Sequence, residues 1–388
     1  MRRRPATAPA RIVLVCAMAL AALCVPARAT GYSVLAHEAN IDALWDTAMK
    51  PMLQARFPDT TADQLLDART LIRDAQDVNE YAFALGALGH YSADNEGHPL
   101  AVNLAVALMY PKLKARFGDI VTYEQSPKSH VMVEFAFDVV QVAAAAYAPE
   151  AYHSFIGFRV AKPLLERAFR ETYGIEMKEI FFNEDLAIGT YRHAVATTIP
   201  EMTKVAWGKK RDEIRKVIPG AQRKTFVFSL RRGQYDKEFG VDYEKPHGFA
   251  RFLAFVYRLI PKIGPFRALR FSVPTPEAEC LFLASFTATR ERFRQSLDAV
   301  SAGRLRLVNT NFDTGRPTAR GEYAMADETY DELLGRLADH AFATASEPLR
   351  ANLLAYYGDA DSLHAGTAGE RSATIRQQLA ALGTTQKP

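Results

Sequence analysis

The stretch NEYAFALGALGHYSADNEGHPLAVN, residues 79–103, decides the fold class, because its apolar residues recur with the period of an α-helix. The same spacing continues through 33–148 and 151–217, where we expect further helices packed on one another. Ser126 followed by Pro127 is a helix-start signal, since serine caps a helix and proline is tolerated at its first position. The sequence therefore predicts a mainly α protein. The expected helices span 32–46, 79–94, 127–147, 163–172, 185–198 and 201–216.

The N-terminal 29 residues carry the pattern of a secretory signal peptide. Three arginines at 2–4 precede an apolar run over 12–25, and Ala-Arg-Ala at 27–29 is typical of a cleavage site. A membrane anchor is the alternative, but the apolar run is short for a bilayer span. We expect cleavage after Ala29 and a periplasmic or secreted protein.

The charge balance changes once this segment is set aside. The formal net charge of the chain is +4, and removing the five arginines of 1–29 leaves −1 for 30–388. Because polyanion binders usually carry a clear positive excess, we expect no nucleic acid partner. Of the three cysteines only Cys280 lies beyond the signal segment, so the mature chain has no internal disulfide.

The C-terminal half has a different pattern. Phe226, Phe228 and Leu230 alternate, and turn residues follow one another within 307–323, so both segments indicate strands or a hairpin. Basic and aromatic residues are interleaved over 248–271. This segment either makes peripheral contact with an anionic membrane surface or forms a core helix with basic rims.

Two pairs of metal-binding residue types stand out in the helical half. His90 and Asp94 are four residues apart, so they project from one helix face about 6 Å apart, which suits a shared metal ion. His98 follows four residues later. Because it stands between Gly97 and Pro99, we expect the helix to end before it and His98 to approach from a turn.

His130 and Glu134 repeat this spacing on the next helix, and two such pairs on facing helices would form a metal cage. His37, in the first turns of the expected helix over 32–46, is a further candidate ligand. Imidazole and carboxylate donors without cysteine favour zinc, with Asp94 able to bridge two ions, although manganese and iron accept the same donors. The alternative is that each pair is only an ion pair on a helix face.

These segments resemble a known family. The run 79–94, continuing through HPLAVN at 98–103, resembles the metal-binding core of bacterial zinc-dependent phospholipase C proteins. GYSVLAHE at 31–38 is similar to their N-terminal histidine segment, and 129–134 resembles their later His and Glu helix. The resemblance extends more loosely to Trp207. It implies an all-helical domain with three zinc ions, which bind the phosphate and activate water for attack on a phosphodiester. The implied zinc ligands are His37, His90, Asp94, His98, His130 and Glu134, and no catalytic residue is assigned.

The chain departs from the family pattern in two places. Family members carry a further Asp and a further His before the segment matching Asn79, whereas 58–79 offers five aspartates and no histidine. In family members the mature chain often begins with a Trp whose terminal amine is a metal ligand, whereas cleavage after Ala29 makes Thr30 the first residue of this mature chain. We therefore expect between one and three zinc ions, with the third position incomplete.

We expect an exported zinc-dependent phosphodiesterase that hydrolyses phospholipid in the manner of phospholipase C. A non-catalytic or impaired metal-stabilised envelope protein is the alternative from another class. A zinc nuclease of the single-strand-specific type is the alternative within the hydrolases, with little electrostatic support. The expected organisation is a signal peptide over 1–29, the helical phospholipase C-like domain over 30–217, a smaller mixed α/β region over 218–346 and a loosely ordered tail over 347–388.

Overall fold

The computed structural model is mainly helical in the part of the chain that it describes. The described residues are 34–56, 76–143, 160–179, 184–193, 199–223, 271–308, 310–322, 324–358 and 369–384. Among them the backbone pairing outside helices includes one isolated antiparallel bridge, between Thr310 and Pro317, and no strand. The prediction of a mainly α protein is confirmed for these residues.

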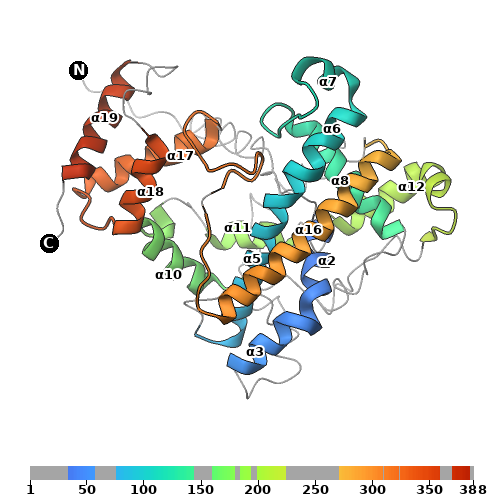
Figure 1. The fold of residues 1–388 in the computed structure, drawn as a ribbon, viewed down its shortest axis with the longest axis horizontal. Helices are drawn as coiled ribbons and strands as arrows, with labels where there is room; N and C mark the ends of the chain where they lie inside the picture. Colours follow the sequence, from blue (N-terminus) through green and yellow to red (C-terminus); the bar gives the residue numbers. More distant parts are fainter. Residues whose placement is uncertain are drawn as a thin grey trace, which may run out of the picture.

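The helices follow one another in the order shown by colour in Figure 1. The helical elements are α2 (Val34–Leu44), the π-helix η1 (Trp45–Met49), α3 (Lys50–Arg56), α5 (Val78–Gly97), the π-helix η2 (His98–Val102), α6 (Asn103–Met109), α7 (Pro111–Phe117), α8 (Pro127–Ala143), α10 (Lys162–Tyr173), the 3-10 helix η3 (Met177–Glu179), α11 (Glu184–His193), α12 (Ile199–Val217), α16 (Pro276–Ser301), α17 (Ala324–Asp339), α18 (Glu347–Tyr357) and α19 (Gly369–Thr384).

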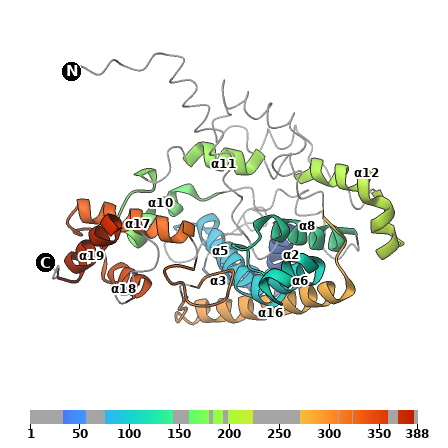
Figure 2. The same ribbon diagram turned by 90° about the horizontal axis from the view of Figure 1, so that it is seen from above.

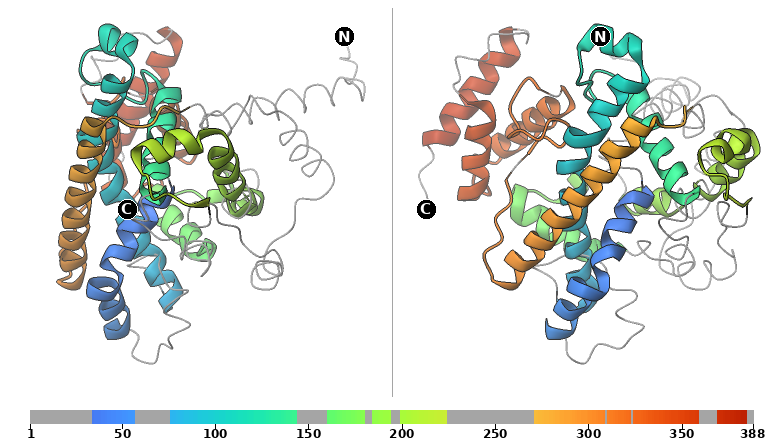
Figure 3. Two further views of the ribbon diagram at one scale, coloured as in Figure 1. Left: turned by 90° about the vertical axis from the view of Figure 1, so that its right-hand side faces the viewer. Right: turned by 45° about the vertical axis from the view of Figure 1, so that its right-hand side comes forward.

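Helix α5 lies at the centre and begins with a variant of the capping box. The Asp77 side chain accepts a hydrogen bond from the Glu80 backbone N–H at 2.9 Å, and the Glu80 side chain accepts one from the Gln76 N–H at 2.8 Å. Helix α16 runs along α5, and α2 contacts both (Figures 1 and 3). These three helices therefore hold residues far apart in the sequence side by side.

Gly89 shows how closely these helices approach. A Cβ at this position would lie 3.1 Å from the Phe293 ring of α16 and 3.3 Å from the Ile41 side chain of α2. Phe293 belongs to a core formed with buried residues of α3, α5 and α10, among them Leu53, Leu85 and Leu164. Only a glycine lets α5 pass the other two helices at this distance.

The predicted end of the helix before His98 is wrong. Helix α5 continues to Gly97 and passes through the π-helix η2 directly into α6, so His98 lies within a continuous helical path. Pro99 lacks an N–H and would leave a carbonyl of the preceding turn unpaired in a regular helix. The wider π-turn accommodates the proline, and such turns are frequent at functional sites.

The C-terminal helices α17, α18 and α19 pack on one another at one end of the molecule, and α12 lies at the other (Figure 2). Their core contains Leu334, Leu353 and Ile375, together with Ile175 from the segment after α10. Over 347–388, where we predicted a loosely ordered tail, the described residues contain the helices α18 and α19. Sparse apolar residues of α19 recur at helical spacing, and they suffice when α17 supplies the opposite face.

The mixed α/β character predicted over 218–346 is not found in the described residues, where this region contains α16, α17 and extended segments. The turn predicted within 307–323 is present, whereas the strands predicted there are not found in the described residues. The Asn311 N–H donates to the Arg316 carbonyl at 2.8 Å, which closes a tight turn flanked by a single bridge. The polar side chains here bond to backbone groups and so replace a strand ladder.

Several expectations fall outside the described residues. They concern the signal segment over 1–29, the alternating residues over 225–230 and the basic aromatic segment over 248–270. Phe271, the last residue of that segment, is buried and lies edge-on against Phe135 of α8. None of the described helices combines the length and apolar character needed to span a bilayer.

Candidate metal centre

The first candidate metal group joins α2 and α5. The His37 Nε2 lies 3.4 Å from Asp94 Oδ1, and the His90 Nε2 lies 3.2 Å from Asp94 Oδ2. The two imidazoles also meet each other, with their Nδ1 atoms 3.2 Å apart. The structure therefore brings together three of the six predicted ligands, with Asp94 buried at 1% exposure between the histidines.

This arrangement calls for an additional positive charge. Each Nε2 faces a carboxylate oxygen of Asp94, and a proton or a metal ion between the two atoms would satisfy both. With both Nε2 atoms protonated and both rings neutral, the two Nδ1 atoms of His37 and His90 point lone pairs at each other across 3.2 Å. A proton or a metal ion removes the conflict. Donor atoms on one tetrahedral zinc ion lie about 3.3 Å apart, as follows from Zn–N bonds of about 2.0–2.1 Å.

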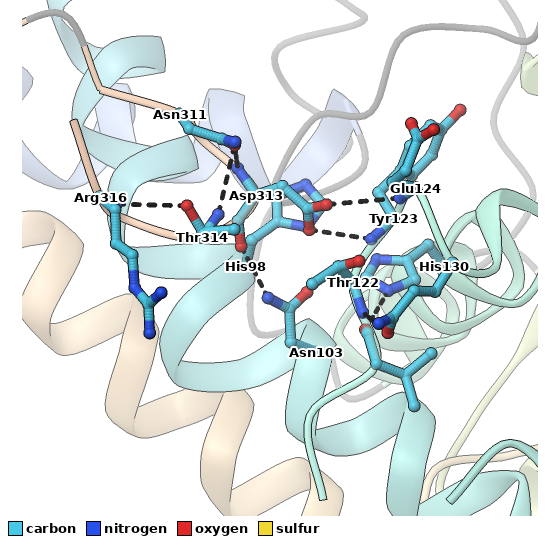
Figure 4. Close-up of polar contacts among 12 residues, drawn as sticks. His98, Asn103, Thr122, Tyr123, Glu124, His130, Asn311, Asp313, Thr314 and Arg316 are labelled. Carbon is cyan, nitrogen blue, oxygen red and sulfur yellow. Dashed lines mark hydrogen bonds and ion pairs between the residues drawn. The ribbon is translucent and has the colours of Figure 1, made fainter. Parts of the chain in front are cut away.

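The second candidate group contains His98, His130 and Asp313, whose donor atoms lie within 4.8 Å of one another. The His98 Nδ1 is 3.5 Å from Asp313 Oδ1, and the rings of His98 and His130 stack with their centroids 5.4 Å apart. Figure 4 shows the three side chains converging from η2, α8 and the turn before α17. Both histidines were predicted as ligands, whereas Asp313 was not.

His130 is held in one tautomer by the backbone. Its Nε2 lies 2.6 Å from the Val121 carbonyl oxygen, which can only accept, so Nε2 carries the hydrogen and Nδ1 presents its lone pair. A ligating histidine usually donates its other N–H in this way. Among the described residues, this buried Nδ1 has no hydrogen-bond partner. Burial and the neighbouring His98 lower the pKa of His130 to about 3, although the bond to Val121 opposes the shift.

Glu134 lies one turn beyond His130 on α8 and connects the two groups electrostatically. Burial raises the pKa of the Glu134 carboxyl well above its ordinary value, and the charges of Asp94, Asp138 and Asp313 raise it further. The carboxylates of both groups therefore act on this one side chain. Among the described residues Glu134 belongs to neither group of three, and its Oε1 is buried without a hydrogen-bond partner.

The donors fit zinc by their chemistry. The imidazole nitrogens and carboxylate oxygens are ligands that zinc accepts, and each group supplies two nitrogens and one carboxylate. Buried carboxylates are costly unless cations compensate them, and Asp94, Glu134 and Asp138 are all at most 5% exposed. Hard-cation sites would contain more oxygen donors.

Sequence reasoning missed Asp313 because its partners are far away in the chain. It follows Asn311 in a segment whose residues were recognised only as turn formers, and nothing local marks it as a ligand. The neighbouring hydrogen bond from Asn103 to Asp313 spans 210 residues of sequence. The only available signal was an unassigned aspartate in a stretch that needed a fixed turn.

One comparison with known proteins found a match. Residues 37–183 match the family model described as zinc dependent phospholipase C. No curated protein and no solved structure matched the chain. The matched range contains all six predicted ligands but not Asp313. The match confirms the resemblance found in the sequence: residues 37–183 are similar to the zinc-dependent phospholipase C family.

Proposed function

We propose that the chain is a zinc-dependent hydrolase of phosphodiesters that acts on phospholipid in the manner of phospholipase C. The observation that carries this proposal is the pair of His/His/Asp groups connected by Glu134. The choice of phospholipid is supported by the family match alone. The arginine-rich start and Ala-Arg-Ala pattern of 1–29 support export to the periplasm or beyond.

Six side chains would hold the metal. His37, His90 and Asp94 would hold one ion, and His98 and His130 would contribute to another. Glu134, whose carboxyl responds to the charges of Asp94 and Asp313, would serve either ion. Bound zinc would supply a water of lowered pKa and would polarise a phosphoryl oxygen.

The protein's own residues provide fixed geometry and shielding. The Val121 carbonyl orients the His130 imidazole, and the Asp94 carboxylate lies within 3.4 Å of both histidines of the first group. His98 and His130 are fully buried, whereas His90 is 46% exposed at its side chain. The second group is thus shielded from water and the first opens to solvent at His90. A phosphodiester would therefore approach from the His90 side.

The test combines metal analysis with hydrolysis of a chromogenic phosphocholine ester. We expect at least two zinc ions per chain, hydrolysis that a chelator abolishes and added zinc restores, and loss of metal in His90→Ala. His340→Ala, which alters an exposed histidine just after α17, is the matched control and should behave as wild type.

Fewer than two zinc ions together with no hydrolysis after zinc addition would refute the enzyme. Full zinc content with no hydrolysis of choline, ethanolamine or nucleotide phosphodiesters would favour the non-catalytic, metal-stabilised protein instead. Hydrolysis of single-stranded nucleic acid with none of phospholipid esters would favour the nuclease.

A further inference from the structure

We propose that Asp313 is a metal ligand of the second group, supplied from outside the family-matched range to complete a site whose two histidines lie inside it. The inference rests on the proposed function in one respect, that the centre binds zinc. It adds a ligand, and it makes the segment before α17 part of the metal centre.

The turn that carries Asp313 is closed by its own hydrogen bonds. The Gly315 N–H donates to the Asn311 carbonyl at 2.8 Å, and the Asn311 side chain accepts from the Asp313 N–H at 2.9 Å. Gly315 has a φ of +71°, in the left-handed region that glycine adopts without strain. These bonds within the turn therefore fix the backbone of Asp313 independently of its contacts with the helices.

The same turn is fastened to the helical region that bears the histidines. The Asn103 side chain donates to the Asp313 carbonyl at 2.7 Å, and Gly315 lies so close to Pro99 that a Cβ would be 3.0 Å from the proline ring. Farther back, the Tyr91 hydroxyl donates to the Val308 carbonyl at 3.0 Å. These contacts set the carboxylate beside His98.

One short loop before α8 orients two of the three donors. The Tyr123 N–H donates to Asp313 Oδ1 at 2.9 Å, and the Glu124 N–H lies 3.4 Å from Oδ2 (Figure 4). Two residues earlier, the Val121 carbonyl accepts from His130 and leaves Nδ1 available. Outer hydrogen bonds that fix both a histidine and a carboxylate are typical of metal sites.

The acceptor atoms of His130 and Asp313 also point to a cation. His130 Nδ1 is buried and has no hydrogen-bond partner in the described part of the chain, and it belongs to the group with His98 and Asp313. Among the described residues, the Asp313 Oδ2 makes only the long contact to Glu124, so it retains acceptor capacity. Two imidazoles and one carboxylate that converge in this way can form a three-ligand zinc site.

The first experiment uses the full chain with Asp313→Asn. Asparagine keeps the side-chain shape and an oxygen that accepts from the Tyr123 N–H, so a merely structural role predicts unchanged zinc binding. A ligand role predicts that one zinc ion per chain is retained roughly tenfold or more weakly against a competing chelator. Asp119→Asn, at an exposed aspartate, is the control and should retain all zinc.

The second experiment detects contact with the metal directly and does not depend on activity. Asp313→Cys, made in a Cys280→Ser background and loaded with Co²⁺, should show thiolate-to-cobalt charge-transfer absorption, because a cysteine thiolate ligates such ions. The Cys280→Ser protein with Asp313 intact should lack this absorption.

Unchanged zinc retention in Asp313→Asn, or no charge-transfer band in a Co²⁺-loaded Asp313→Cys, would overturn the inference. His98→Ala separates this failure from failure of the proposed function. If His98→Ala loses zinc while Asp313→Asn does not, only the role of Asp313 is refuted. If the wild-type chain binds no zinc and hydrolyses no phosphodiester, the proposed function itself fails.

Discussion

Gly89→Ala tests whether α2, α5 and α16 approach as closely as the structure shows. In an unhindered helix this substitution stabilises by about 0.8–1 kcal/mol, because alanine is the better helix former. Here the new methyl carbon would lie 3.1 Å and 3.2 Å from two ring carbons of Phe293, whose exposure is 0%. Overpacking of a filled core costs about 1–3 kcal/mol, so we expect a net loss of about 1 kcal/mol.

The matched control is Gly335→Ala in α17, where the nearest atom to a new Cβ is the Gln378 side-chain nitrogen at 3.9 Å. The end of a flexible side chain can move, so this variant should be more stable than wild type by up to about 1 kcal/mol. Both are measured by urea unfolding of the zinc-free protein, followed by circular dichroism.

A second measurement connects this packing with the metal site. Moving α2 away from α5 would separate His37 from His90, so Gly89→Ala should also bind zinc more weakly, while Gly335→Ala should not. If both alanine variants were stabilised equally and bound zinc equally well, the close approach at Gly89 would be refuted.

Two more predictions concern acid sensitivity and helix capping. In the zinc-free protein His130 takes up a proton near pH 6.5 when unfolded but only near pH 3 when folded, so the unfolding free energy should fall as pH is lowered between these values, by up to about 1.4 kcal/mol per unit. His130→Gln should flatten this slope in urea titrations at several pH values. Glu134, whose raised pKa gives a slope of the opposite sign, is present in both proteins and so does not affect the comparison. An unchanged slope in His130→Gln would contradict the buried neutral imidazole. Asp77→Ala should lower stability by about 1 kcal/mol through loss of the cap on Glu80 N–H, whereas Asp77→Ser should retain most of it; equal melting temperatures of the two variants would argue against the capping box.

The features that followed from the sequence are those encoded locally. The helix predicted over 79–94 is α5, and the one predicted to begin at Pro127 is α8, because periodic apolar residues and a start signal lie within each segment. The i, i+4 spacing likewise placed His90 beside Asp94. Local patterns are sufficient where a helix fixes the geometry.

The features that were missed depend on tertiary contacts. Pro99 suggested a helix end, but packing against α16 favours a continuous path through a π-turn, so His98 lies on a helix. The turn residues around Asp313 suggested a hairpin, but their hydrogen bonds go to the turn itself and to Asn103. No periodicity or spacing rule relates two residues 210 positions apart.

The anchoring of the Asp313 segment has a consequence for how the protein is made. Just beyond the turn, the Arg320 N–H donates to the Tyr356 carbonyl and the Arg320 guanidinium pairs with Asp331, so α17 and α18 hold the far end of this segment. A ribosome delivers the N-terminal helices first, and they can pack before the rest of the chain exists. The group formed by His98 and His130 then lacks Asp313 until the C-terminal helices have been synthesised. If Asp313 ligates the second ion as proposed, metal loading of the second group would be a late event, and a chain that stops short of Tyr356 would hold its first ion while its second site stays open.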